Sequence, residues 1–186
     1  GDGDQTDYYP LVTPEIVAHE FTHGVTEYSA GLIYSGESGA MNESFSDIFG
    51  NTIRFIYTPA NATWFVGDQM IIPSSGGQPF RNMANPNQFQ CADTYGGLWW
   101  NNGDVVHYDS GVQNFWYYLL VNGGTGTNDV PNNYSVSGIG LTDAAAIAYS
   151  NLAVYLTPNS TFMDSRNFSE QAAADLFGSC SNQQIQ

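Results

Sequence analysis

One five-residue stretch, H-E-F-T-H at residues 19–23, constrains the chain more than any other. It lies in a run, residues 13–30, that reads as a helix. Side chains four positions apart share one face of a helix, so His19 and His23 can direct two imidazoles at one point, with Glu20 beside it. Two imidazoles and a neighbouring carboxylate predict a zinc site with a general base next to it. Because the motif is short, two histidines on a partly buried helix face remain the alternative.

A second stretch, residues 39–50, supplies what a zinc site still lacks. Catalytic zinc usually takes three protein ligands, and Glu43 is the candidate for the third. Asp47 follows one helical turn later, where it can hydrogen-bond a ligand histidine and fix its tautomer. The alternative is a solvated acidic face, but the apolar residues Phe45 and Ile48 favour a buried helix, in which a carboxylate needs a partner or a metal.

These motifs resemble the thermolysin family of secreted neutral zinc metallopeptidases. The resemblance rests on H-E-x-x-H, on Gly-Leu-Ile-Tyr at 31–34 and on Glu-Ser-Gly-Ala-x-Asn-Glu-x-x-Ser-Asp-Ile-Phe-Gly at 37–50. It continues, in the same order along nearly the whole chain, through Arg81-Asn-Met, His107-Tyr-Asp-Ser-Gly, Gly138-Ile-Gly and Tyr155-Leu-Thr-Pro.

The resemblance implies a mainly α fold, the helical C-terminal lobe of such a peptidase, with long irregular loops and little β structure. The chain has 186 residues, a length that suits one domain, residues 1–186. The helix signals fall at 13–30, 41–57, 110–122, 142–156 and 165–177, and residues 58–107 read as mostly irregular. In the family a β-rich lobe precedes this region and a short helix follows it. We expect both to be absent from this chain.

The resemblance also assigns roles to individual residues. It implies peptide hydrolysis with zinc on His19, His23 and Glu43, where zinc polarises the scissile carbonyl and activates water, and Glu20 serves as general base. It assigns stabilisation of the oxyanion to Tyr34 and His107. The residues expected to hydrogen-bond the zinc ligands and His107, and so to hold them in position, are Asp47, Asn42, Asp104 and Asn102.

Substrate recognition is expected around Phe80-Arg81. The resemblance implies that Arg81 grips the substrate carbonyl, and the alternative is a structural ion pair with a nearby acid. The pocket just after the scissile bond would accept bulky apolar residues. Its expected lining is Tyr8, Leu11, Ile16, Val66, Met70 and Phe80.

Two departures from the family pattern stand out. The family usually has an aspartate five residues before the catalytic histidine, and this chain has Asn102 there, with Asp104 three before. Either His107 has lost its carboxylate or Asp104 has replaced it.

The family often holds two calcium ions at a site that here contains Glu15, Arg54 and Asp68. Calcium remains possible, but we expect the double site to be lost, with the Arg54 guanidinium replacing the ions and pairing with Glu15 or Asp68.

Composition limits the partners and the compartment. Eighteen acids against three arginines, with no lysine, give a formal net charge of −15. Such a surface repels nucleic acid and anionic membranes, and no apolar stretch is long enough for a membrane span. The expected partners are a peptide or protein substrate and the protein's own N-terminal lobe or a propeptide, and the expected location is secreted. Cys91 and Cys180 are either one disulfide or two free thiols.

A second function stays open. The same fold can serve as a catalytically incomplete zinc-binding lobe that acts as a binding or regulatory module. Two features favour this alternative: the upstream strand that we expect this chain to lack, and the replacement at Asn102.

Overall fold

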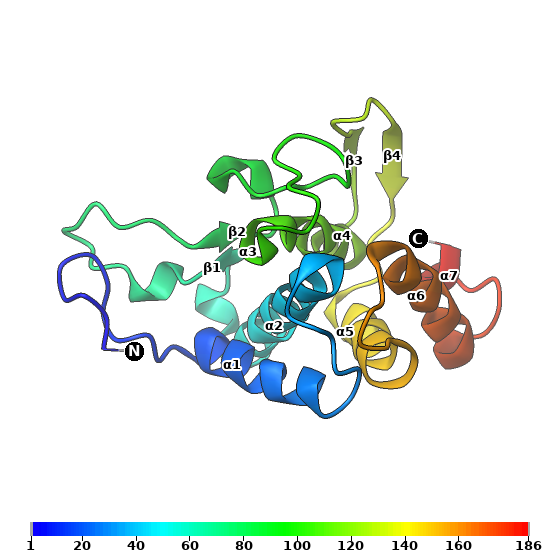
Figure 1. The fold of residues 1–186 in the computed structure, drawn as a ribbon, viewed down its shortest axis with the longest axis horizontal. Coiled ribbons are helices and arrows are strands. Elements are labelled where there is room, and N and C mark those ends of the chain that lie inside the picture. Colours follow the sequence, from blue (N-terminus) through cyan, green and yellow to red (C-terminus); the bar gives the residue numbers. More distant parts are fainter. Residues whose placement is uncertain (1, 186) are drawn as a thin grey trace.

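The computed structural model describes residues 2–185 and is mainly helical, as expected (Figure 1). The helices are α1 (Pro14–Glu27), α2 (Gly36–Tyr57), α3 (Val106–Asp109), α4 (Gly111–Asn122), α5 (Leu141–Ser150), α6 (Phe162–Phe177) and α7 (Asn182–Ile185). A π-helical turn, Asn151–Tyr155, extends α5, and 3-10 turns lie at Pro59–Asn61, Asp68–Met70 and Pro86–Phe89. None of the described helices is long and apolar enough to cross a membrane.

Helix α2 is the centre of the molecule, and α1, α3, α4, α5 and α6 all contact it (Figure 1). Every residue from 38 to 48 is buried, the polar Asn42, Glu43 and Asp47 included, so this part of the helix is covered on all sides. Gly50 permits the closest of these contacts, because a Cβ there would lie 2.6 Å from the carbonyl oxygen of Glu15. The backbone of α1 therefore crosses α2 closely enough for side chains of both helices to meet.

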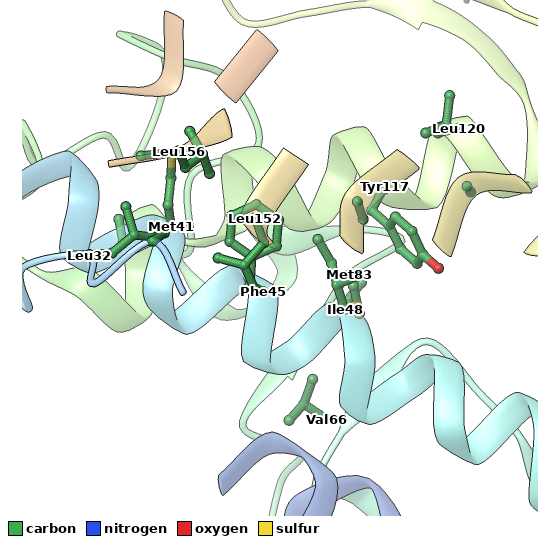
Figure 2. Close-up of a cluster of buried hydrophobic side chains, with 14 of the residues drawn as sticks. Leu32, Met41, Phe45, Ile48, Val66, Met83, Tyr117, Leu120, Leu152 and Leu156 are labelled. Carbon is green, nitrogen blue, oxygen red and sulfur yellow. The ribbon is translucent and has the colours of Figure 1, made fainter. Parts of the chain in front are cut away.

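The hydrophobic core surrounds α2 (Figure 2). Met41, Phe45 and Ile48 project from α2 and are fully buried. Tyr117 of α4 and Leu152 of the π-helical turn close the core from the other side, and both are also fully buried. This continuous apolar packing fixes the polar residues that α2 carries between its core positions.

Three helix boundaries differ from the sequence prediction. Helix α1 ends at Glu27 and not near Ala30, and α2 begins at Gly36 and not near residue 41. Helix α6 begins at Phe162, preceded by a capping box in which the Thr161 side chain accepts a hydrogen bond from the backbone N–H of Asp164. A further one-turn helix, α7, follows α6 and was not predicted.

The described strands are short and form two antiparallel pairs. β1 (Phe65–Val66) pairs with β2 (Arg81–Asn82), so that Val66 lies opposite Arg81. β3 (Gly124–Thr127) and β4 (Asn133–Val136) form a hairpin that projects from the helical body (Figure 1). No sequence pattern predicted this hairpin. The β1–β2 pair matters for the site because it delivers Arg81 to the buried face of α2.

Candidate zinc site

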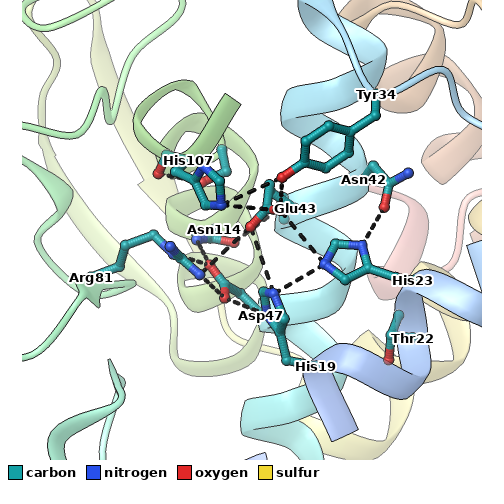
Figure 3. A network of polar contacts seen from close by, with 12 residues as sticks. His19, Thr22, His23, Tyr34, Asn42, Glu43, Asp47, Arg81, His107 and Asn114 are labelled. Carbon is teal, nitrogen blue, oxygen red and sulfur yellow. Dashed lines mark hydrogen bonds and ion pairs between the residues drawn. The ribbon is translucent and has the colours of Figure 1, made fainter. Parts of the chain in front are cut away.

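Two helices bring the expected ligands together. α1 directs His19 and His23 toward α2, and α2 directs Glu43 back toward them (Figure 3). The two histidine Nε2 atoms lie 3.2 Å apart, and the Glu43 carboxylate lies 3.6 Å from His19 Nε2 and 3.5 Å from His23 Nε2. One ligand atom from each of the three residues therefore falls within 4.8 Å of the other two.

The outer nitrogens of both histidines are held by acceptors. Asp47 Oδ1 accepts from His19 Nδ1 at 3.0 Å, and Asn42 Oδ1 accepts from His23 Nδ1 at 2.7 Å. The orientation of Asn42 is fixed because its Nδ2 donates to the carbonyl of Leu32. With Nδ1 carrying the proton, each neutral histidine presents an Nε2 lone pair to the other and to Glu43.

This donor set fits a cation. Glu43 is only 1% exposed, and its Oε2 atom has no hydrogen-bond partner among the described residues. Two imidazole lone pairs and a buried carboxylate repel one another unless a positive charge lies between them. Two nitrogens and one carboxylate oxygen are the ligands that catalytic zinc takes in several peptidases. The residues present therefore suit zinc with a fourth position open.

Asp47 is the centre of a second network behind the ligands (Figure 3). Arg81 donates two hydrogen bonds to its carboxylate, from Nε at 2.6 Å and from Nη2 at 2.7 Å, and Asn114 Nδ2 donates a third at 2.8 Å. Burial disfavours the charged form of Asp47, but Arg81 and His19 outweigh burial and hold its pKa well below the usual range. Asn114, on α4, was not predicted, because a lone asparagine in an aromatic helix carries no sequence signal.

Arg81 thus forms the structural ion pair that was the alternative reading of this residue. Its Nη2 also lies 3.8 Å from Glu43 Oε2, and the residue is 8% exposed. Through its hydrogen bonds to Asp47, Arg81 helps to hold the ligand His19 in place. Contact between Arg81 and a substrate stays a prediction.

Tyr34 and His107 face Glu43 from the open side of the site. The Tyr34 hydroxyl donates to Glu43 Oε1, and His107 Nε2 lies 3.4 Å from both the Tyr34 hydroxyl and Glu43 Oε1. Burial, together with the hydrogen bond to Glu43, raises the pKa of Tyr34. Tyr34 therefore keeps its proton and remains a donor at neutral pH.

The predicted support of His107 is not present. Among the described residues, neither Asn102 nor Asp104 hydrogen-bonds His107, and both are exposed. The buried acid of this loop is Asp109, which accepts from the backbone N–H of Gly103 at 2.8 Å and of Asn101 at 2.9 Å. His107 is therefore positioned by the loop backbone and by α3, and no carboxylate of the described residues hydrogen-bonds its outer nitrogen.

A cleft of about 580 Å³ opens beside the site, and two of the ligands, His19 and Glu43, line it. Leu11, Ile16 and Phe80 line it as expected, and so does Glu20. Tyr8 packs against the ring of Phe80, with ring centroids 5.5 Å apart. Two further residues, Cys91 and Tyr108, also line the cleft and were not predicted to do so.

Val66 and Met70 do not line the cleft, contrary to the expectation. Val66 is 2% exposed and Met70 is fully buried, and both belong to the hydrophobic core. A Cβ at Gly67 would meet Met70 and Phe80 on the same side, at 3.1 Å and 2.9 Å. Met70 therefore lies close to Phe80 but inside the core.

Arg54 occupies the region where the sequence departs from the usual calcium ligands. Its guanidinium donates to Asp68 at 2.5 Å and 3.2 Å, and it lies 4.0 Å from Glu15. It also donates to the carbonyls of Asn61 at 2.7 Å and Phe65 at 3.3 Å. The pairing predicted for Arg54 is thus present in the structure.

The two cysteines are free thiols. Cys91 is buried and Cys180 is exposed, so the disulfide alternative is not formed. Burial raises the pKa of Cys91 to about 11.

Comparisons with known proteins agree with this chemistry. Residues 30–186 match the family model described as thermolysin metallopeptidase, alpha-helical domain, and residues 1–27 match the one described as thermolysin metallopeptidase, catalytic domain. The chain is 41% identical to a bacillolysin of Bacillus caldolyticus and to a thermolysin of Alicyclobacillus acidocaldarius subsp. acidocaldarius. Each match covers 98% of this chain and 33% of the relative, so the chain spans about a third of the length of these curated relatives.

A solved structure has the same fold. The precursor of protealysin, a metalloproteinase from Serratia proteamaculans, superposes with a TM-score of 0.75 at 26% sequence identity. The match covers all of this chain and 59% of that one.

Proposed function

The chain belongs to the thermolysin metallopeptidase family, and from this premise we propose that it carries the zinc site and catalytic base of a secreted endopeptidase that cleaves before bulky apolar residues. The observation that carries the proposal is the meeting of His19, His23 and Glu43 within 4.8 Å, with Glu20 on the adjoining wall of an open cleft. When bound there, zinc would supply Lewis-acid polarisation of the scissile carbonyl and acidify a water molecule.

Glu20 is the candidate general base. It follows His19 on α1, so its side chain leaves the helix beside the ligands and not among them. It is exposed to the cleft, and no hydrogen bond or ion pair to another described residue occupies its carboxylate. Glu20 can therefore take a proton from the attacking water and pass it to the leaving amine.

Tyr34 and His107 are the candidate donors for the oxyanion. Both already converge on Glu43 Oε1, so a carbonyl oxygen bound at the same side of the site would find two donors in place. Arg81 would act mainly by holding Asp47, and through it His19, in position.

The cleft supports a preference for apolar side chains. Leu11, Ile16 and Phe80 present apolar surface beside Glu20 and the ligands, and Phe80 is 39% exposed at the opening. A leucine or phenylalanine after the scissile bond would bury its side chain there, at about 25 cal/mol for each Å² of apolar surface.

The outer face of α1 supports a docked upstream lobe. Val17, Phe21, Val25 and Tyr28 recur at helical spacing and are 40%, 75%, 43% and 88% exposed. A contiguous apolar stripe on a helix usually marks an interaction surface. The α1 stripe, defined by these four residues, fits a β-rich lobe or a propeptide of the same protein.

A catalytically incomplete binding module is the second candidate. The absence of a carboxylate behind His107, among the described residues, favours it, because an unsupported histidine stabilises an oxyanion less well.

Hydrolysis of a quenched peptide with leucine after the scissile bond tests the proposal. The full-length protein, loaded with zinc, is compared with Glu20→Gln and with Glu170→Gln, which makes the same change at an exposed position of α6. We expect Glu20→Gln to lose about 10²–10⁴-fold in kcat with its zinc content unchanged, and Glu170→Gln to match the parent. Equal turnover in all three would exclude Glu20 as the base. One bound zinc without turnover in the parent would favour the binding module.

A further inference from the structure

A second cavity lies between α4 and α6, away from the zinc cleft. It has a volume of about 450 Å³, within the range of small-molecule sites, and shares no lining residue with the cleft. Its apolar wall comes from Val112 and Trp116 of α4, from Phe162 and Met163 of α6, and from Tyr95. The Tyr95 and Phe162 rings lie edge to face, with centroids 6.2 Å apart, so the wall is largely aromatic.

One polar group in this wall lacks a partner. Gln113 lines the cavity and is only 4% exposed. Its Oε1 accepts from Ser165 Oγ at 2.8 Å, but its Nε2 has no hydrogen-bond partner among the described residues. No other polar side chain of the lining has a buried atom without a partner in the described part of the chain. A buried amide N–H₂ group favours a ligand that brings a hydrogen-bond acceptor.

The charges at the cavity favour a neutral ligand. Glu37 lines it, and both carboxylate oxygens are used, one by the Tyr95 hydroxyl at 2.9 Å and one by the backbone N–H of Phe162 at 2.8 Å. Arg166, also in the lining, pairs with Glu170 at 3.6 Å. An anion would meet Glu37 and the net charge of −15, and a cation would find no free carboxylate oxygen of Glu37.

We propose that this cavity binds a small, neutral, largely aromatic molecule with one hydrogen-bond acceptor, such as an aryl ketone or aryl amide. The ring packs against Trp116 and Phe162. Because Gln113 Nε2 is itself buried, its amide turns toward the cavity to donate to the carbonyl oxygen. The site is independent of zinc and of peptide hydrolysis.

A matched pair of probes tests the proposal on the full-length protein. Acetophenone carries the carbonyl, and α-methylstyrene has the same shape with a methylene group in its place. Binding is followed by NMR through the indole N–H resonance of Trp116, which is assigned by its loss in Trp116→Phe. We expect both probes to shift this resonance until the site is saturated. Acetophenone should bind with a Kd about five- to tenfold lower, because its carbonyl accepts a hydrogen bond from the Gln113 amide.

Two variants separate the two parts of the site. Gln113→Met keeps the size of the side chain but removes the donor, so it should abolish the preference for acetophenone and leave the affinity for α-methylstyrene unchanged. Val112→Phe fills the cavity and should abolish binding of both probes. The proposal is overturned if neither probe saturates the Trp116 resonance, if the parent binds both equally, or if the preference survives in Gln113→Met.

Discussion

Replacing Arg54 by methionine should destabilise the fold strongly. The Arg54 side chain is 1% exposed, and it is the only cation within 4.0 Å of Glu15, whose two carboxylate oxygens have no hydrogen-bond partner among the described residues. The substitution leaves Glu15, 1% exposed, and Asp68, 20% exposed at its side chain, without their counter-charge. Removing one partner from a buried ion pair costs about 3–5 kcal/mol of unfolding free energy. For a domain of this size that lowers Tm by roughly 6–20 °C.

Thermal unfolding of the full-length protein measures this loss. Arg166→Met is the matched control, since Arg166 pairs with Glu170 on the surface, with side chains 71% and 53% exposed. That change should alter stability by no more than about 0.5 kcal/mol. Arg54→Lys should fall between, because it keeps the charge but loses the fork of hydrogen bonds. Equal Tm values for Arg54→Met and Arg166→Met would refute the reasoning.

The same assay tests whether Arg54 replaces calcium at Glu15 and Asp68. We expect a calcium-selective chelator to leave the Tm of the parent unchanged. A chelator-induced fall in Tm that calcium reverses, and that Asp68→Asn abolishes, would place calcium at this site.

Three further predictions concern Asp47 and the cysteines. Asp47→Asn should weaken zinc affinity about 10–100-fold in a competition titration, because His19 loses its carboxylate; an unchanged affinity would contradict this role. Iodoacetamide should alkylate Cys180 within minutes and Cys91 only on unfolding, as read by peptide mass mapping, and similar rates would contradict the burial of Cys91. Because the folded state raises the pKa of Cys91 from 9.0 to about 11, the folded state keeps this proton to higher pH than the unfolded chain does. Stability should therefore be independent of Cys91 below pH 9 and fall from pH 9 to 11, and Cys91→Ala should remove that part of the fall in denaturant titrations.

The zinc-bearing helices could be predicted because their signals are local. Thr13 and Pro14 mark the start of α1, and the helical spacing of His19 and His23 fixes their common face. Thr13 is the N-cap residue, but its side chain makes no cap hydrogen bond. The start of α2 was missed because Gly36 and its neighbours read as a turn.

Tertiary packing explains the early start of α2. A Cβ at Gly39 would lie 2.8 Å from Val106, and a Cβ at Gly103 would lie 2.7 Å from the backbone of Gly36. These glycines permit close contact between α2 and the loop that carries His107. Such contacts join residues far apart in the chain, and a helix signal taken from one segment does not contain them.

The β3–β4 hairpin and the burial of Val66 and Met70 could not be predicted from the sequence either. The strand Gly124–Thr127 has no apolar alternation, so its pairing with β4 leaves no periodic pattern. Val66 and Met70 are apolar residues near the cleft, and sequence alone does not say which side of the wall they occupy. The support of Asp47 by Asn114 likewise depends on the packing of α4 against α2.

Zinc-edge X-ray absorption on the protein loaded with one equivalent of zinc tests the three-residue site most directly. We predict two imidazole nitrogens and one carboxylate oxygen from the protein, all at about 2.0–2.2 Å, with no sulfur, and loss of the site in His19→Ala. A sulfur scatterer at about 2.3 Å would place Cys91, which lines the same cleft, on the metal. That result, or a spectrum unchanged by His19→Ala, would contradict zinc binding by His19, His23 and Glu43.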